Sequence, residues 1–438
     1  MSDLAPAWRP IAGAALAAGL VVAGAVPAAG QELPESVFDA QDLLRRPGTV
    51  DPLLLPLDKQ TAQSGIVIGP GLVVTPTAEV GPLLNTNVFG TPRGDADVAA
   101  SVAPDVTVRS REGGAYSLGA YVHSNVAVYS DHRTENVLEL FGGVDLDRPV
   151  APDTRFRARV EGGRYVQDRA ASFELVNTRS PIKFERIVGA VGLTVTPGRF
   201  IVSPSVEIDR LAVHDNRLGD RPDIVFVARD RSYVRINPEL VVGYAVSPIT
   251  AVFAGVEANS RDYDLTRVPD RDSTGYAVYG GIRFRPTPLT RVDLALGYIQ
   301  QNYVRPLTSP SAPYIRAAFL YSPTRLTRVR ADIRRDVSET GGLAVGGAVR
   351  TRAGVDVEHR LFRDIWVQGG AELRRFRFPT IDRTDVRVVL TAGVTRLVNR
   401  AFDVFVRGEQ LWSDSNASVG LDYNFSRTRV VGGLRLRA

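Results

Sequence analysis

From residue 71 to the C-terminus, this chain alternates between apolar and polar side chains with a period of two. In the stretch "AVRTRAGVDVE", Val349 and Val355 share one parity, whereas Arg350 and Arg352 take the other. A period of two is the repeat of a β-strand, whose successive side chains point to opposite faces. The pattern therefore predicts strands with one apolar face and one charged face over most of the chain.

The alternating segments are long and numerous. Each has about 11 to 17 residues, whereas strands of globular proteins usually have about five or six, and a tilted strand crosses a bilayer with about 9 to 11. We predict eighteen strands, at 71–84, 97–110, 114–129, 134–147, 153–166, 181–196, 199–213, 231–246, 249–263, 273–286, 289–304, 312–322, 325–336, 345–360, 363–378, 383–397, 400–414 and 419–437.

The connections between these segments alternate in length. Tight turns such as 247–248, 286–288 and 322–324 alternate with longer polar loops such as 85–96 and 214–229. Short turns on one rim and long loops on the other are typical of outer-membrane barrels. In hydrocarbon every backbone polar group must be paired, so the sheet has to close. We therefore predict an all-β fold, a transmembrane antiparallel up-and-down barrel of about 18 strands, spanning 71–438.

The N-terminus differs from the rest of the chain. Arg9 precedes an apolar run from Ile11 to Val26, and small residues follow up to Gly30. This is the pattern of a secretory signal peptide, so we predict cleavage after residue 30 and export through the periplasm to the cell outer membrane. Residues 31–70 lack the period of two, and we expect a periplasmic leader or a small plug there.

Composition excludes several classes of function. The chain has no Cys, so disulfides and Cys-ligated metals are excluded. The net charge of +5 comes from arginines scattered among Asp and Glu, which argues against a nucleic-acid partner. No G-x-S-x-G, H-E-x-x-H or P-loop motif occurs, and only four His are present. We expect no enzymatic activity, no cofactor and no bound metal.

The polar parity gives a list of lumen-lining candidates. Their signs nearly balance, which predicts either a wet, mixed-charge pore or a network of ion pairs that fills the barrel. Eighteen strands are wide enough for a channel. The candidates are Arg109, Arg155, Arg157, Arg159, Glu161, Glu257, Arg283, Asp293, Arg328, Arg330, Arg350, Arg352, Glu358, Glu372, Arg374, Arg407 and Glu409.

Four stretches resemble a known family. They are "NTNVFGTP" (85–92), "RDSTGY" (271–276), "TPLTRVDLALGYIQQNY" (287–303) and "YSPTRLT" (321–327). They are similar to the β-barrel porin type 2 family of Gram-negative bacteria, and the likeness runs over about residues 70–438. Some members of that family resemble outer-membrane proteins found with exopolysaccharide biosynthesis. The resemblance implies an outer-membrane barrel, and because its motifs are turns it assigns no residue a role.

Three functions remain open at this point. The first is a porin-like channel for small hydrophilic solutes. The alternatives are an accessory barrel for exopolysaccharide export or surface anchoring, and a non-conducting structural barrel. The expected partners are outer-membrane lipid and lipopolysaccharide, the barrel-assembly machinery, and either a polysaccharide or small hydrophilic solutes, with no nucleic acid.

Overall fold

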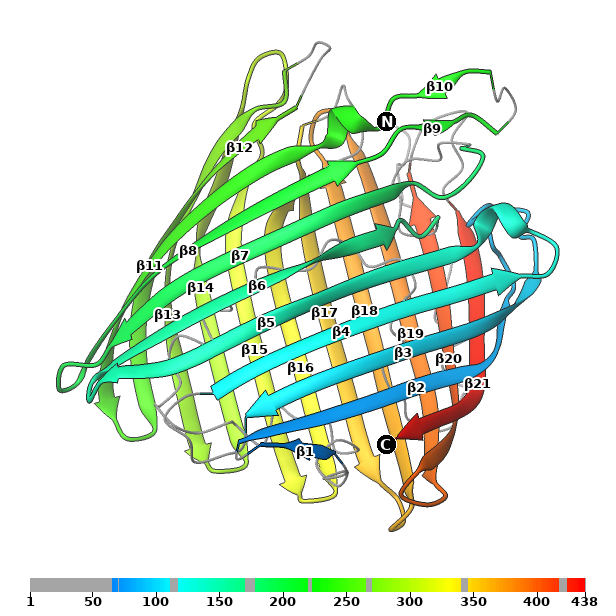
Figure 1. Cartoon of the computed structure of the whole chain (residues 1–438). Helices are drawn as coiled ribbons and strands as arrows, with labels where there is room; N and C mark the ends of the chain where they lie inside the picture. Colours follow the sequence, from blue (N-terminus) through cyan, green and yellow to red (C-terminus); the bar gives the residue numbers. More distant parts are fainter. Residues whose placement is uncertain are drawn as a thin grey trace, which may run out of the picture.

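The computed structural model describes residues 65–69, 71–110, 117–169, 178–219, 223–264, 270–339, 346–416 and 424–437. Over these residues the chain forms one closed barrel of antiparallel strands (Figure 1). The predicted signal peptide, residues 1–30, lies outside the described residues, as does most of the predicted leader or plug at 31–70.

Each barrel strand pairs with its neighbours in the sequence, and β21 pairs with β2 to close the ring. The predicted all-β up-and-down barrel is therefore confirmed. In the described part of the chain, the eighteen barrel strands are β2 (Leu72–Asn85), β3 (Asp97–Ser110), β4 (Ser117–Tyr129), β5 (Val137–Ala151), β6 (Thr154–Val166), β7 (Lys183–Val195), β8 (Phe200–Val213), β11 (Tyr233–Ser247), β12 (Thr250–Tyr263), β13 (Ser273–Thr287), β14 (Thr290–Tyr303), β15 (Ser311–Thr324), β16 (Thr327–Ser338), β17 (Ala348–Arg360), β18 (Ile365–Phe378), β19 (Arg383–Leu397), β20 (Phe402–Ser415) and β21 (Phe425–Arg437).

The end of the predicted irregular leader is a strand. Ile66–Ile68 forms β1, which pairs antiparallel with Leu72–Val74 at the start of β2. The partner strand β21 reaches β2 only as far as Thr77. It therefore leaves the first residues of β2 without a neighbour on that side, and β1 occupies this place. Unpaired backbone groups at a strand edge are costly in a membrane barrel. By pairing with the start of β2, β1 satisfies these groups.

The repeated turns fold in one way. Thr287 pairs with Thr290, and the Thr287 hydroxyl donates to Thr290 Oγ1 at 3.0 Å. The same hydroxyl oxygen accepts a hydrogen bond from the backbone N–H of Leu289 at 3.2 Å. Thr324 and Thr327 repeat both features in the next hairpin but one. A hydroxyl that bonds the backbone two residues ahead stabilises a tight turn, which explains the recurring Thr and Ser.

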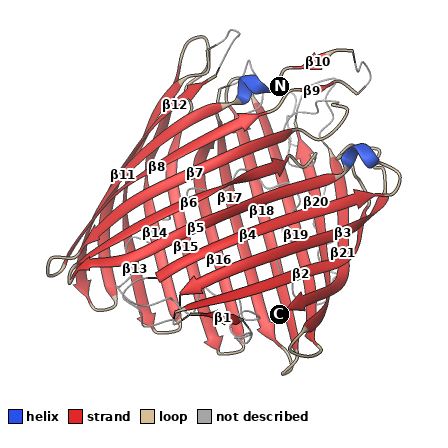
Figure 2. Ribbon diagram, viewed as in Figure 1, coloured by secondary structure: helices blue, strands red, loops and turns tan. Residues whose placement is uncertain are grey.

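The opposite rim carries the longer connections. Two of them contain single 3₁₀ turns, η3 (Arg133–Glu135) and η4 (Arg229–Arg231), and one contains the small hairpin of β9 (Asn216–Arg217) and β10 (Val225–Phe226). Figure 2 shows these elements together at one end of the barrel, opposite the C-terminus. Among the described residues, no helix combines the length and apolar character that crossing a bilayer requires.

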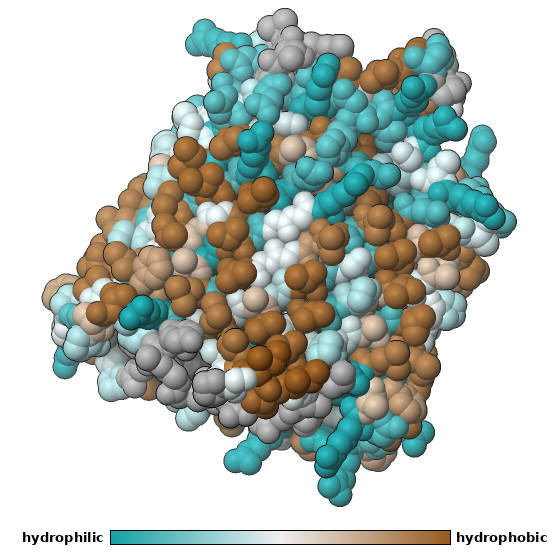
Figure 3. All heavy atoms as spheres, in the orientation of Figure 1, coloured by the Kyte–Doolittle hydropathy of each residue, from teal (hydrophilic) through white to brown (hydrophobic). Residues whose placement is uncertain are grey.

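The barrel is apolar on its outer face and ionic on its inner face. Leu138, Val160 and Ile187 are more than half exposed on the outside, and Figure 3 shows hydrophobic side chains spread over the wall between more hydrophilic ends. On the inside, charged side chains such as Arg186 and Asp209 are buried. This is the reverse of a protein folded in water and is the arrangement expected of a wall that faces lipid.

The place where the ring closes is tightly packed. We call β20, β21 and β2 the seam. A Cβ atom at Gly81 would lie 1.9 Å from the carbonyl oxygen of Gly432, and one at Gly433 would lie 2.0 Å from the carbonyl oxygen of Val80. Real Cβ contacts are never this short. The backbones of β2 and β21 can therefore approach this closely only because both positions are Gly.

Candidate functional site

The inner wall of the barrel is the candidate site. On their strands, the seventeen predicted lumen-lining positions have the parity opposite to the exposed apolar residues. On β13, for example, Arg283 is buried between the exposed Ile282 and Phe284. The structure thus places these positions on one continuous inner surface, contributed by strands from all around the ring.

Many of these residues meet in ion pairs. Asp293 on β14 contacts Arg283 on β13 and accepts a hydrogen bond of 2.6 Å from Arg291 Nε. Glu372 on β18 accepts a hydrogen bond of 2.7 Å from Arg352 Nε and also contacts Arg374. In each case one carboxylate bridges two guanidinium groups, so the inner wall is laced across neighbouring strands.

The sequence analysis missed several partners in these networks. Arg186 on β7 makes a bidentate pair with Asp209 on β8, at 2.7 and 2.8 Å, and Arg235 on β11 lies 3.2 Å from the same carboxylate. Arg186 has the inward parity of β7, between the exposed Ile187 and Glu185. Strand parity alone could therefore have identified Arg186 as an inward-facing residue.

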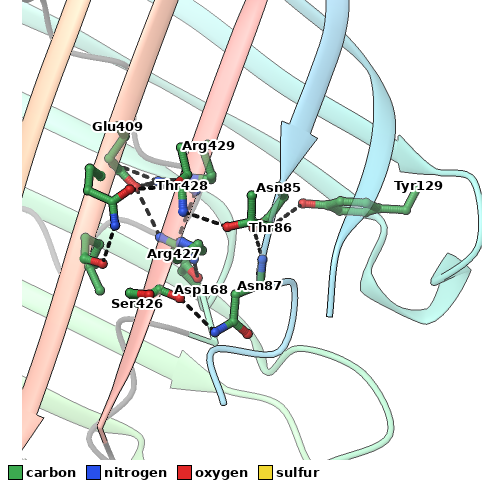
Figure 4. Close-up of polar contacts among 12 residues, drawn as sticks. Asn85, Thr86, Asn87, Tyr129, Asp168, Glu409, Ser426, Arg427, Thr428 and Arg429 are labelled. Atoms are coloured by element: carbon green, nitrogen blue, oxygen red, sulfur yellow. Dashed lines mark hydrogen bonds and ion pairs between the residues drawn. The ribbon is translucent and has the colours of Figure 1, made fainter. Parts of the chain in front are cut away.

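A second group lies at the seam (Figure 4), and the sequence analysis named only Arg407 and Glu409 of its members. Arg429 on β21 donates to both carboxylate oxygens of Glu409, at 3.0 and 2.9 Å. Arg427 and Arg429 also contact Asp168, from the loop after β6, at 2.6 and 3.3 Å. Nearer the C-terminus, Glu79 of β2 bridges Arg407 and Arg435.

The contact of Asp168 shows that a loop folds inward. The loop begins at the end of β6, yet Asp168 reaches the inner face of β21, five strands away around the ring. The next residue, Arg169, makes a bidentate pair with Glu135 of η3, at 2.8 and 2.6 Å. We call the contact of Asp168 with Arg427 and Arg429 the first latch.

A second latch lies further around the same rim. Glu339 directly follows β16 and accepts a hydrogen bond of 2.8 Å from the hydroxyl of Tyr303 on β14. Arg261 and Tyr263 on β12 donate to the same carboxylate. Burial raises the pKa of Glu339, but the charges of Arg261 and Arg271 lower it by more, so its net pKa lies below the usual value. The carboxylate is therefore held ionised.

Apolar packing also narrows this end of the lumen. Tyr165 of β6 stacks on Phe184 of β7 and on Phe141 of β5, each with ring centroids 5.3 Å apart. Tyr165 and Phe184 belong to a buried cluster that includes Ile182 and Ala228 from the connections at this rim. These rings therefore form a core under the loops and do not present open faces to the lumen.

One of the four histidines lies between two aspartates at a rim of the barrel. Among the described residues, no group of three or more His, Cys, Asp or Glu is placed to hold a metal. His132, in the loop after β4, lies between Asp97 and Asp95, at 3.0 and 3.1 Å. Burial lowers the pKa of His132, but these two aspartates raise it by more, so its pKa lies above the usual value.

Charge is distributed unevenly around the inner wall. The strands β2–β5 and β13–β16 lie on opposite sides of the ring (Figure 1). The inward positions of β2–β5 hold six carboxylates and one arginine, and those of β13–β16 hold seven arginines and three carboxylates. A polar solute between such walls experiences a transverse field that orients its dipole. The residues are Glu79, Asp97, Asp105, Arg109, Glu139, Asp145 and Asp147 on one side, and Arg283, Arg285, Arg291, Asp293, Arg316, Arg328, Arg330, Asp332, Arg334 and Asp336 on the other.

Solved structures similar to this chain include two receptors and a polysaccharide outer membrane secretin. A mutant of the ferric enterobactin receptor PfeA from Pseudomonas aeruginosa is 7% identical, with a TM-score of 0.43 and coverage of 83% of this chain and 80% of that one. The ferric-catecholate import receptor Fiu from E. coli K12 is 10% identical, with a TM-score of 0.46 and coverage of 85% and 78%. A bacterial polysaccharide outer membrane secretin is 10% identical, with a TM-score of 0.35 and coverage of 85% and 100%.

Because these TM-scores are below 0.5, we base no argument on the three likenesses. None of the curated proteins matches the sequence. A family model does match, and it covers residues 61–438, which include the whole barrel. The chain belongs to the family described as "Putative beta-barrel porin 2" and is an outer-membrane β-barrel protein.

Proposed function

We propose that this protein is a channel for small hydrophilic solutes across the outer membrane. One observation carries the proposal: several charged side chains on the inner wall remain accessible to water. The side chains of Arg159, Arg330 and Arg352 are 37%, 35% and 31% exposed. A barrel filled by its own ion pairs would bury such groups, whereas barrels of 16 to 18 strands leave an aqueous channel.

The two latches limit the channel to small solutes. Both fold loop residues against the inner wall at the rim that carries the long connections. A solute must pass between these segments, whereas in the part of the chain that the structure describes the middle of the lumen is lined by strand side chains. We therefore propose diffusion of small solutes and not passage of a folded protein.

The export or anchoring of a polysaccharide is supported less well. A sugar-conducting lumen needs aromatic faces on which sugar rings stack. Tyr279 and Phe376 point inward but are only 3% and 1% exposed. Tyr279 stacks on Tyr314 with centroids 4.8 Å apart, which occupies one of its faces.

Conductance of the purified full-length protein in a planar lipid bilayer tests the proposal. A channel gives stepwise current increases and a steady ohmic conductance in potassium chloride. The matched control is the same preparation heat-denatured before addition. A correctly folded barrel that gives no steady current would overturn the channel and leave the non-conducting structural barrel.

Export of the chain is a second part of the proposal. We propose that residues 1–30 direct secretion and are then removed, and that the barrel-assembly machinery inserts residues 71–438. N-terminal sequencing of the protein from outer-membrane fractions tests this, and we expect the mature chain to begin at Gln31. A mature chain that retains the apolar run of residues 11–26 would contradict it.

A further inference from the structure

One row of the inner wall consists of arginines placed side by side. In the strand register, Arg316 of β15 lies opposite Arg334 of β16, which lies opposite Arg352 of β17. The row continues through β18 and β19. All of its members have the inward parity of their strands. We call this row the arginine belt: Arg316, Arg334, Arg352, Arg374 and Arg387.

We propose that the arginine belt binds oxyanions, so that the channel prefers small solutes that carry a carboxylate or phosphate group. The inference rests on the proposed channel function and names its substrate class. Arginine suits this role because the planar guanidinium group forms paired hydrogen bonds with carboxylate and phosphate.

The belt is costly for the fold. Neighbouring strands lie about 4.8 Å apart, and like charges directly opposite one another destabilise a sheet. Elsewhere in this barrel many facing positions carry opposite charges, as Arg283 and Asp293 do. Like charges face each other there only as single pairs, such as Arg235 with Arg261. A run of five like charges therefore needs another reason, and an anionic ligand supplies one.

Nearby carboxylates offset only part of the charge. One flanking row holds Asp332 and Glu372, and the other holds Asp336, Asp385 and Arg350. Over β15–β19, the belt and these two rows therefore keep a net charge of +2. The region remains attractive to an anion even with every carboxylate ionised.

The belt borders a recess large enough for a small anion. The recess has a volume of about 240 Å³ and is lined by Arg316, Arg334 and Arg352 of the belt. Ala318 lies in the adjoining row and lines the same recess, and its small side chain leaves this space open. Arg291 and Arg330 complete the basic lining, with Asp293 and Asp332 as the acidic members.

The middle of the belt is also open to the lumen, whereas Arg387 at its end is buried. The side chains of Arg334, Arg352 and Arg374 are 24%, 31% and 24% exposed. Each of them contacts a carboxylate through Nε. A guanidinium group has five N–H donors, so its exposed part can also donate to a solute in the lumen.

The variant R334Q/R352Q tests the belt with little disturbance of the fold. Asp336 keeps its bidentate partner Arg350, at 3.0 and 2.7 Å, and Glu372 keeps Arg374. The control is R375Q/R377Q, which removes the same charge from exposed positions of the outer parity of β18. Heat-modifiable migration in SDS gels checks that all three proteins are folded.

The first measurement is the reversal potential in a potassium chloride gradient, together with block of the current by sodium phosphate or sodium glucuronate. We expect anion preference and block for the unaltered protein and for R375Q/R377Q, and a several-fold lower anion-to-cation permeability ratio and weaker block for R334Q/R352Q. A conducting barrel without anion preference or block by either anion would overturn the proposal, as would equal effects of the two variants.

The second measurement does not depend on conductance. Isothermal titration of the detergent-solubilised full-length protein with phosphate and with glucuronate reports binding directly. Binding that R334Q/R352Q weakens several-fold and R375Q/R377Q leaves unchanged supports the belt, even for a barrel that does not conduct. In that case the proposed channel function would be wrong, and the proposed anion-binding site would be supported. No binding of either anion overturns the belt.

Discussion

Arginines gather on two parts of the inner wall, the seam and the belt wall β15–β19, and the arginines in the middle of the belt are more exposed than those at the seam. At the seam, the side chains of Arg427 and Arg429 are 3% and 5% exposed and share Glu409 and Asp168. In the belt, the side chains of Arg334 and Arg352 are several times more exposed. The same residue type thus forms buried ion pairs in one place and, in our proposal, a surface for solutes in the other.

The difference follows from what each wall must do. The seam has to join the first and last strands, and the backbones of β2 and β21 approach each other closely at Gly81 and Gly433. A charge buried there must be paired, because an unpaired one costs several kcal/mol. The belt wall lies within a continuous run of hairpins, and the recess beside it stays open.

The largest effect is expected from blocking the close approach at the seam. Gly81→Val places a Cβ 1.9 Å from the carbonyl oxygen of Gly432. We expect the closed barrel to be lost, seen as the absence of the heat-modifiable band from outer-membrane fractions. The control is Gly189→Val on β7, because a Cβ added at Gly189 meets nothing within 4 Å. Normal assembly of Gly81→Val would contradict the tight seam.

The next effect compares one substitution at the two walls. Glu409→Gln removes the negative charge that Arg427 and Arg429 share. We therefore expect the free energy of unfolding to fall by about 3 kcal/mol. Glu372→Gln in the belt wall affects more exposed partners, for which we expect about 1 kcal/mol or less. Urea unfolding of the barrel in lipid vesicles measures both. Equal losses would remove the distinction between the walls.

A third effect concerns the first latch, which ties a loop to the seam but does not touch the belt. Asp168→Asn removes the negative charge that pairs with Arg427 and Arg429 and so weakens the first latch. We therefore expect higher or more variable single-channel conductance with unchanged anion preference. Asp131→Asn, at an exposed loop position near the same rim, is the control. A change in anion preference as large as that of R334Q/R352Q would argue against separate roles for seam and belt.

The smallest effect is a pH dependence beside the seam. The pKa of His132 is raised by Asp97 and Asp95, so its protonated form stabilises the loops next to β2 and β3. This stabilisation is fully present below the unfolded value of about 6.5 and is lost as the pH rises through the raised pKa. We expect His132→Gln to lower the melting temperature at pH 5.5 and to have little effect at pH 9. An equal drop at both values would exclude the titration.

Strand parity made much of this fold predictable. The predicted segments 97–110 and 383–397 coincide with β3 and β19, because a wall between lipid and water imposes strict alternation on every strand. Parity also placed Arg352 and Glu372 on the inner face. Parity alone could have added Arg316 and Arg334, which follow the same alternation on their strands.

The belt and the latches could not be predicted, for two physical reasons. The register shifts beside the turn, since Thr324 pairs with Thr327 but Tyr321 pairs with Val329. Counting back from the turn would therefore place Arg316 opposite Arg335 on the outer face. The latch of Asp168 to Arg427 joins residues 259 positions apart, and no local pattern encodes such a contact.

Thiol labelling of single-cysteine variants tests the central claim most directly, because the chain has no Cys of its own. Thr391 and Leu390 are neighbours on β19, the first on the inner face and the second exposed on the outer face. For protein in lipid vesicles, we predict that a charged, membrane-impermeant thiol reagent labels Thr391→Cys and leaves Leu390→Cys unlabelled. Labelling of Leu390→Cys with no labelling of Thr391→Cys would contradict a barrel with a wet, ionic interior.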